Sequence, residues 1–332
     1  MKSIYISLFI FINCAVSYAQ DPVFTQYAMV PETINPGFTG ILETTSIGVL
    51  HRSQWPDLDF RVETDFAYGS FWFKQANSGL GFTALNHREN FTNFTFTQLN
   101  AVYTYRVELT DDWYFRPAIE VGAGFKSFGF GNVVLEDQIN IGNGTINPIS
   151  IDPNSRPNRN VFFTDISAGA LFNNDKIWAG LTLRHLNKPN ISLTENGNVP
   201  LDMFFSVNTG YKFLLADYID IIRLPYETQM LLTANFMKQG EFSRLDFGTQ
   251  LIFKKFFFGV SAVTNPMKTT GNSHLVSSIN ALAGLQYEHL KFGISHDFNV
   301  SKLGKTGGIY ELSLSYQFDL DVNCLGCPQY AP

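Results

Sequence analysis

The six histidines of this 332-residue chain are the side chains best suited to bind a metal ion or to move protons near neutral pH. They are scattered along the sequence, and none belongs to an HExxH motif or to another pair with metal-ligand spacing. No GxSxG sequence marks a serine hydrolase, and no glycine loop of the phosphate-binding type occurs. We therefore predict a chain that is not an enzyme and has no catalytic residue, metal or cofactor.

Two cysteines, Cys324 and Cys327, form a CxxC sequence close to the carboxyl terminus. A redox-active CxxC needs a thioredoxin-like βαβ context, which the surrounding sequence lacks. Outside the cytosol the two residues can form a disulfide. We interpret them as a staple of the tail or as a family-specific chain end.

The first residues have the anatomy of a secretory signal peptide. Lys2 precedes an apolar run over residues 4–16, and a small-x-small cleavage site ends at Ala19. No later stretch reaches the roughly 18 apolar residues that a membrane-spanning helix needs. We predict a signal peptide over residues 1–19 and export from the cytoplasm.

An alternation of apolar and polar side chains runs through most of the remaining chain. In residues 308–320, for example, Leu312 and Leu314 share one face of an extended chain, whereas Glu311 lies on the other. Charged residues make up only 16% of the chain, against about 25% in soluble proteins. This composition suits a barrel with apolar side chains toward the lipid bilayer. We predict an all-β protein, a transmembrane antiparallel up-and-down β-barrel of about 14 strands over residues 44–320, in the bacterial outer membrane.

Most of the alternating segments span more residues than the mean of about 5–6 for strands in soluble sheets. The predicted strands cover residues 44–55, 61–73, 79–88, 94–107, 113–128, 160–173, 176–186, 202–216, 223–237, 241–254, 256–264, 275–288, 290–302 and 308–320. Connections 74–78 and 174–175 are short, whereas connections 129–159 and 187–201 are long and polar. This alternation predicts short periplasmic turns and long loops outside the cell.

The inward faces of the predicted strands carry charge of both signs. The candidate lumen charges are Arg106, Glu120, Lys126, Arg244, Asp246 and Glu311. We expect them to neutralise one another in a filled lumen, because buried charge needs a partner. A polar conduit or a surface that holds a plug is the alternative. The net charge of −6 gives no basic surface for nucleic acid, and no small-molecule substrate is evident.

Residues 20–43 lack the alternation, and three prolines within them exclude a regular helix or a central strand. We predict an extended or turn-rich arm on the periplasmic side or within the lumen. The tail, residues 321–332, is predicted to face the periplasm as well. Either segment could bind a partner by strand addition or by side-chain docking.

Six short motifs follow one another along the chain. They are Asp21-Pro22-x-Phe24-x-Gln26-Tyr27, Ile34-Asn35-Pro36-Gly37-Phe38-x-Gly40, His51-Arg52-x-Gln54-Trp55-Pro56, Arg184-His185-Leu186-Asn187-Lys188-Pro189, Gly293-Ile294-Ser295-His296-Asp297-Phe298 and Tyr310-Glu311-Leu312. Each has a structural explanation when it is taken alone, such as a turn at Asn-Pro-Gly or an interfacial Trp. Together they resemble the PorP/SprF family of Bacteroidetes outer-membrane proteins over nearly the whole mature chain. One departure is Ile309-Tyr310-Glu311, where members often have Ser-His-Glu.

The resemblance implies a component of the type IX secretion system, linked in some members to gliding motility. It implies contacts with periplasmic ring lipoproteins and with secreted or surface cargo. The candidate partner-docking or family-motif residues are Phe24, Gln26, Tyr27, Asn35, Pro36, Arg52, Gln54, Trp55 and Asp297. We expect Phe24, Tyr27 and Phe38 to be available as anchors for a partner. Two other functions stay open: a FadL-like or porin-like transport channel, and a purely structural barrel.

Overall fold

The computed structural model describes residues 20–129, 134–151, 159–193, 197–218, 225, 227–267, 276–300 and 306–318. The predicted signal peptide, the predicted tail and both cysteines of the CxxC sequence lie outside these residues. None of the helices in the described ranges is long and apolar enough to cross a membrane.

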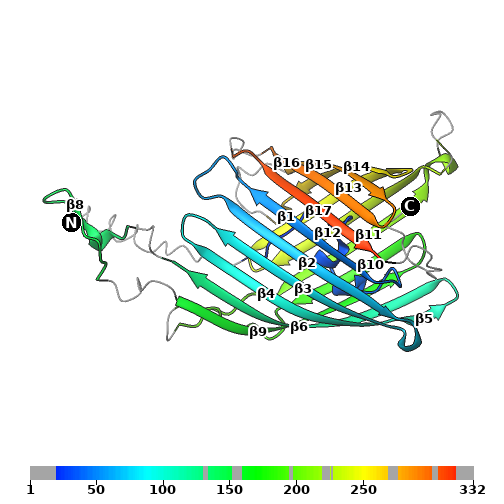
Figure 1. Ribbon diagram of the computed structural model, residues 1–332, viewed down its shortest axis with the longest axis horizontal. Helices are drawn as coiled ribbons and strands as arrows, with labels where there is room; N and C mark the ends of the chain where they lie inside the picture. The colour runs from blue at the N-terminus through cyan, green and yellow to red at the C-terminus, as the bar shows by residue number, and fades with distance from the viewer. Residues whose placement is uncertain are drawn as a thin grey trace.

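Long antiparallel strands form most of the regular structure (Figure 1). They are β1 (Ser46–Gln54), β2 (Val62–Phe73), β3 (Ser78–Glu89), β4 (Phe94–Tyr105), β6 (Trp113–Phe128), β9 (Arg159–Asn173), β10 (Ile177–Arg184), β11 (Phe204–Leu214), β12 (Gln229–Gln239), β13 (Phe242–Phe253), β14 (Phe256–Thr264), β15 (Val276–Tyr287), β16 (Leu290–Asn299) and β17 (Ile309–Gln317). Neighbours in the chain pair with one another, β1 pairs with β17, and β4 pairs with β6. The described strands therefore close into a 14-stranded antiparallel barrel, which confirms the predicted fold.

The fourth and the ninth strands depart from the predicted ranges for a local reason. The fourth strand continues beyond Arg106 as β5 (Val107–Thr110), which also pairs with β6. The ninth strand was expected from residue 223; residues 223, 224 and 226 lie outside the described residues, and β12 begins at Gln229. The reason is a turn in which the backbone N–H and the hydroxyl of Thr228 both donate to the carbonyl of Pro225.

The two ends of the barrel differ in their connections. The end where β1 begins and β17 ends has short links such as residues 174–176 and 254–255, and we call it the turn end. Its longest link is residues 215–228, which contains η7 (Leu215–Asp217). The opposite end, the loop end, has the long connections 129–158 and 185–203. The expected alternation of short and long connections is therefore present, except at the short loop-end links 90–93 and 240–241 and at the longer turn-end link 215–228.

The outer face of the wall is apolar and the inner face is polar. Ile119 and Phe247 are about half exposed, at 50% and 54% of their surface, and point outward. Their neighbours Glu120 and Asp246 are buried within the barrel, at 8% and 1%. The alternation therefore predicted the two faces of these strands correctly.

Phe247 lies in the middle of β13 and is the clearest test of the lipid-facing side. We expect Phe247→Arg to lower the free energy of unfolding by about 2–4 kcal/mol, because a guanidinium would then lie at the bilayer midplane. Phe256→Arg, at the first residue of β14, should cost only about 0–1 kcal/mol, because that position is close to the interface. Urea unfolding in lipid vesicles measures both values. Equal losses for the two variants would show that Phe247 is not at the midplane.

Candidate functional site in the barrel lumen

The arm lies inside the barrel, where Figure 1 shows it in dark blue behind the front strands. It contains two short turns, η1 (Pro31–Thr33) and η2 (Pro36–Phe38). The backbone N–H of Asp21 donates to Oε1 of Gln239, the last residue of β12, so the arm begins at the loop end. Glu43 pairs with Arg106 at the turn end. The arm therefore runs down the lumen before it enters β1.

Apolar side chains attach the arm to opposite parts of the wall. Phe24 and Val30 pack in a buried cluster with wall residues of β1, β2 and β13–β15. Tyr27 and Phe38 pack in a second cluster with β9, β10 and β12, and the ring centroid of Phe38 lies 6.4 Å from that of Trp178. Burial of each large side chain contributes about 1.5–3 kcal/mol. The expectation that Phe24, Tyr27 and Phe38 are available as anchors is wrong for this structure, because the lumen wall covers them.

The Asn35-Pro36-Gly37 turn lies directly on the strands β9 and β10. The Asn35 amide donates to the carbonyls of Ala170 and Leu181, at 3.1 and 3.2 Å. The approach is close, since a Cβ at Gly169 would lie 2.6 Å from Oδ1 of Asn35. A glycine in the wall is therefore what allows this turn of the arm to reach the sheet.

Glu311, on the inward face of β17, is the centre of the polar attachment. Its buried carboxylate accepts hydrogen bonds from the guanidinium of Arg52 and from the backbone N–H groups of Thr25 and Gln26, the latter two at 3.0 and 2.9 Å. The Gln26 amide donates to the Glu311 carbonyl at 2.8 Å and to Oγ of Ser295 at 3.0 Å. We call these five residues the Glu311 cluster. It joins the arm, the first strand and the last two strands.

Two further motif residues lie beside the Glu311 cluster. Gln54 accepts a hydrogen bond from Arg52 at 3.4 Å. Asp297 is 1% exposed and accepts a hydrogen bond from Asn280, whose amide is also 3.2 Å from the hydroxyl of Thr25. The structure therefore brings together motif residues from distant parts of the sequence.

Trp55 is the motif residue that lies away from this cluster. It follows β1 at the loop end, and its ring centroid is 6.4 Å from that of Phe60. Tyr310, at the departure from the family pattern, is 47% exposed on the outer face, and its ring centroid is 4.3 Å from that of His296. A histidine here, which the resemblance led us to expect, would therefore lie on the side of β17 opposite Glu311.

We expected the lumen charges to neutralise one another, but only some of them pair within this set. Arg244 and Asp246 do form an ion pair, at 2.8 Å. Arg106 pairs with Glu43 of the arm, and Lys126 donates to a backbone carbonyl at 3.4 Å. Arg106 lies at the turn end, whereas Lys126 lies near the loop end of β6, so they cannot share partners. The acidic partner of Arg106 comes from the arm, which the strand pattern could not place.

A histidine between two carboxylates holds the start of the arm, a role that no pattern in the sequence indicated. His185 is 1% exposed and lies one residue beyond β10. Its Nε2 is 2.9 Å from the Asp21 carboxylate and its Nδ1 is 2.9 Å from the Asp165 carboxylate. Burial lowers the pKa of His185, but the two carboxylates outweigh burial and raise that pKa to about 10. Burial alone would raise the pKa of Asp21, but the charge of His185 outweighs it and lowers that pKa.

The Asp21–His185 contact should depend on pH in both directions. Asp21 stabilises the contact above its ordinary pKa of about 3.9, and this is lost as the pH falls through its lowered pKa. His185 stabilises it at neutral pH, and this is lost as the pH rises through about 10. A spin label at Val23→Cys should be immobile between about pH 4 and pH 9, and it should become mobile as the pH falls through the lowered pKa of Asp21 or rises through about 10. A label at Leu42→Cys is the control and should stay immobile, and mobility of the Val23 label at pH 7 would contradict the assignment.

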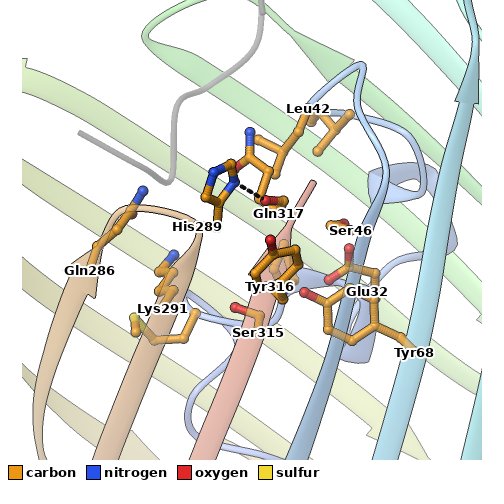
Figure 2. Close-up of a pocket in the computed structure, with 13 residues that line it drawn as sticks. Glu32, Leu42, Ser46, Tyr68, Gln286, His289, Lys291, Ser315, Tyr316 and Gln317 are labelled. Carbon is orange, nitrogen blue, oxygen red and sulfur yellow. Dashed lines mark hydrogen bonds between the residues drawn. The ribbon is translucent and has the colours of Figure 1, made fainter. Parts of the chain in front are cut away.

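A pocket of about 530 Å³, including its solvent-open part, lies at the turn end between the arm and the wall. Figure 2 shows Glu32 and Tyr68 on one side of it and His289 and Lys291 on the other. Burial raises the pKa of Glu32 to about 7. His289 Nδ1 is 2.7 Å from the carbonyl of Gln317. Among the described residues no group of three or more His, Cys, Asp and Glu side chains could hold a metal ion.

Comparison with known proteins gives one family. The model of a family described as "Type IX secretion system membrane protein PorP/SprF" matches residues 16–316, which confirms the resemblance carried by the motifs. No curated protein matches the chain.

Several solved structures are similar to the chain. A KdgM porin is 10% identical, covers 82% of this chain and 99% of its own, and has a TM-score of 0.36. A FadL homologue of Pseudomonas aeruginosa is 9% identical, covers 90% of this chain and 95% of its own, and has a TM-score of 0.45. CdiB from Acinetobacter baumannii is 8% identical, covers 83% of this chain and 60% of its own, and has a TM-score of 0.44.

Proposed function

Since the chain belongs to the PorP/SprF family of type IX secretion system membrane proteins, we propose that it supports the secretion or surface attachment of cargo proteins. The barrel and the family together indicate the outer membrane as its location. In this function the barrel is an anchor, and its lumen is occupied by the chain's own arm. We include in this proposal that the cargo is an adhesin and that its attachment serves gliding motility.

The observation that carries the proposal is the buried arm. Gln26 and Phe38 are both 0% exposed, although they contact different sides of the wall. A diffusion channel needs an open bore, whereas an anchor gains rigidity from a filled lumen. The arm therefore supports a role in holding other proteins rather than in passing small solutes.

The turn end is the side that we assign to the periplasm, because it carries both barrel termini and the short connections. Periplasmic ring lipoproteins would then meet the pocket lined by Glu32, Tyr68 and Lys291. We therefore propose this pocket as the periplasmic docking surface, in place of the aromatic side chains of the arm, which are buried. The loop end faces the outside and is the side available to exported cargo.

A FadL-like or porin-like transport channel is the second candidate. It is favoured by Asn208 and Asn235, which face one another across β11 and β12. Their side chains are buried and have no hydrogen-bond partner among the described residues. Such a polar wall could hold water if the arm moved aside.

Deletion of the gene tests the proposed function directly. Surface proteins are labelled on intact cells of the wild-type, deletion and complemented strains and are compared by mass spectrometry. We expect specific exported proteins to disappear from the surface of the deletion strain and to return on complementation. An unchanged surface proteome, together with large steady conductance of the purified wild-type barrel, would overturn the proposal in favour of the channel.

A further inference from the structure

The loop after β6 contains a small folded unit, residues 134–151, that we call the hairpin. It consists of η5 (Glu136–Gln138), β7 (Ile139–Asn140) and β8 (Thr145–Ile146). Figure 1 shows β8 well away from the wall of the barrel, beyond the loop end. The hairpin is therefore outside the apolar belt of the barrel.

Polar contacts give the hairpin its shape. The Gln138 side chain accepts from the backbone N–H of Leu135 and donates to the carbonyl of Asn147, both at 2.9 Å. The Asp137 carboxylate accepts from the hydroxyl of Ser150 at 2.8 Å and from the backbone N–H of Ile151 at 2.6 Å. These bonds close the base of the hairpin without an apolar core.

The isoleucines of the hairpin are exposed instead of buried. Ile141, Ile149 and Ile151 keep 92%, 79% and 86% of their surface in solvent, and Ile146 keeps 61%. Exposed apolar side chains that gather in one small unit mark an interaction site, and these four isoleucines lie within residues 141–151. The hairpin thus has a shape held by polar groups, and its isoleucines are left exposed.

The charge of the hairpin favours a protein over a membrane surface as the partner. Residues 134–151 contain Glu136 and Asp137 but no Lys, Arg or His. Segments that lie on anionic membranes carry Lys and Arg on their polar face, which this hairpin lacks. An apolar groove with a basic or neutral rim is the complementary surface.

We propose that the hairpin docks an exported protein outside the cell by inserting its isoleucines into an apolar groove with a basic or neutral rim. The proposal rests on the proposed function, because that function brings exported proteins to this face of the barrel. Binding in such a groove would bury the side chains of Ile141, Ile149 and Ile151, the three most exposed large apolar residues of the hairpin.

The test replaces these three isoleucines together, as Ile141→Ser, Ile149→Ser and Ile151→Ser. Their side chains make no contact on which the hairpin's polar bonds depend, so the barrel should assemble normally and keep its heat-modifiable migration. The control replaces two apolar residues elsewhere at the loop end, Phe60→Ser and Phe91→Ser, which are 49% and 47% exposed. An impermeant reagent on intact cells should label Ile141→Cys and not Asp175→Cys, in a chain whose two tail cysteines are serine.

The probe is an exported protein that the deletion strain loses from its surface, purified and titrated against the purified barrels. We expect the triple variant to bind it at least about tenfold more weakly than the wild type, and the control variant to bind it normally. Wild-type affinity in the triple variant would overturn this inference, even where the deletion strain confirms the proposed function. Loss of binding to anionic vesicles without loss of protein binding would overturn it in favour of a membrane contact. An unchanged set of surface proteins in the deletion strain would instead contradict the proposed function itself.

Discussion

A barrel whose residues 26–40 are replaced by a Gly/Ser linker of equal length should conduct ions across a planar bilayer, whereas the wild-type barrel should show little steady conductance. The reason is that these residues cross the lumen and pack against opposite sides of the wall. Gln26 holds the arm to β16 and β17, and the turn at Asn35 holds it to β9 and β10. A flexible linker without these contacts cannot occupy the bore in one conformation.

The control for this experiment keeps the arm and changes an exposed residue at the loop end, for which Phe60→Ser is suitable. It should conduct as little as the wild type. Large steady conductance of the wild-type barrel would show that the arm does not close the lumen, and would favour transport. A linker variant that assembles but stays non-conducting would show that the wall side chains alone fill the bore.

The wall of the barrel could be predicted from the sequence because its constraint is local. Adjacent residues such as Asp246 and Phe247 must point to opposite sides of a strand, so a period of two assigns the faces. Strand ends depend on turn chemistry, and they were predicted well where the turn is short. The start of β12 was predicted too early, because the turn in which Thr228 donates to the carbonyl of Pro225 gives no periodic signal in the sequence.

The position of the arm could not be predicted in the same way. Its residues have no period, and their partners are far away in the sequence: the bond between Gln26 and Glu311 joins residues 285 positions apart. The motifs selected several of the correct residues but not their mutual contacts. His185 shows the same limit, since its role appears only when Asp21 and Asp165 meet it from two other parts of the chain.

The Glu311 cluster carries the largest expected loss of stability from a single substitution. Glu311→Ala should lower the free energy of unfolding by about 3–5 kcal/mol, because it leaves the buried charge of Arg52 without its partner. It also leaves the backbone N–H groups of Thr25 and Gln26 without acceptors, which should loosen the arm. Urea unfolding in vesicles measures the first effect, and protease sensitivity of the arm measures the second.

Two further variants separate the effect of the unpaired Arg52 charge on stability from the effect of Glu311 on the attachment of the arm. Glu63→Ala removes the partner of Arg61 and Arg88, whose side chains are 44% and 48% exposed, and should cost no more than about 1 kcal/mol. The double variant Arg52→Met with Glu311→Met should regain much of the lost stability, because no unpaired charge then stays buried. Its arm should still be sensitive to protease, because the N–H groups of Thr25 and Gln26 again lack the carboxylate. If the double variant instead protects its arm fully, the carboxylate is not what attaches the arm, and the apolar clusters around Phe24 and Phe38 hold it alone.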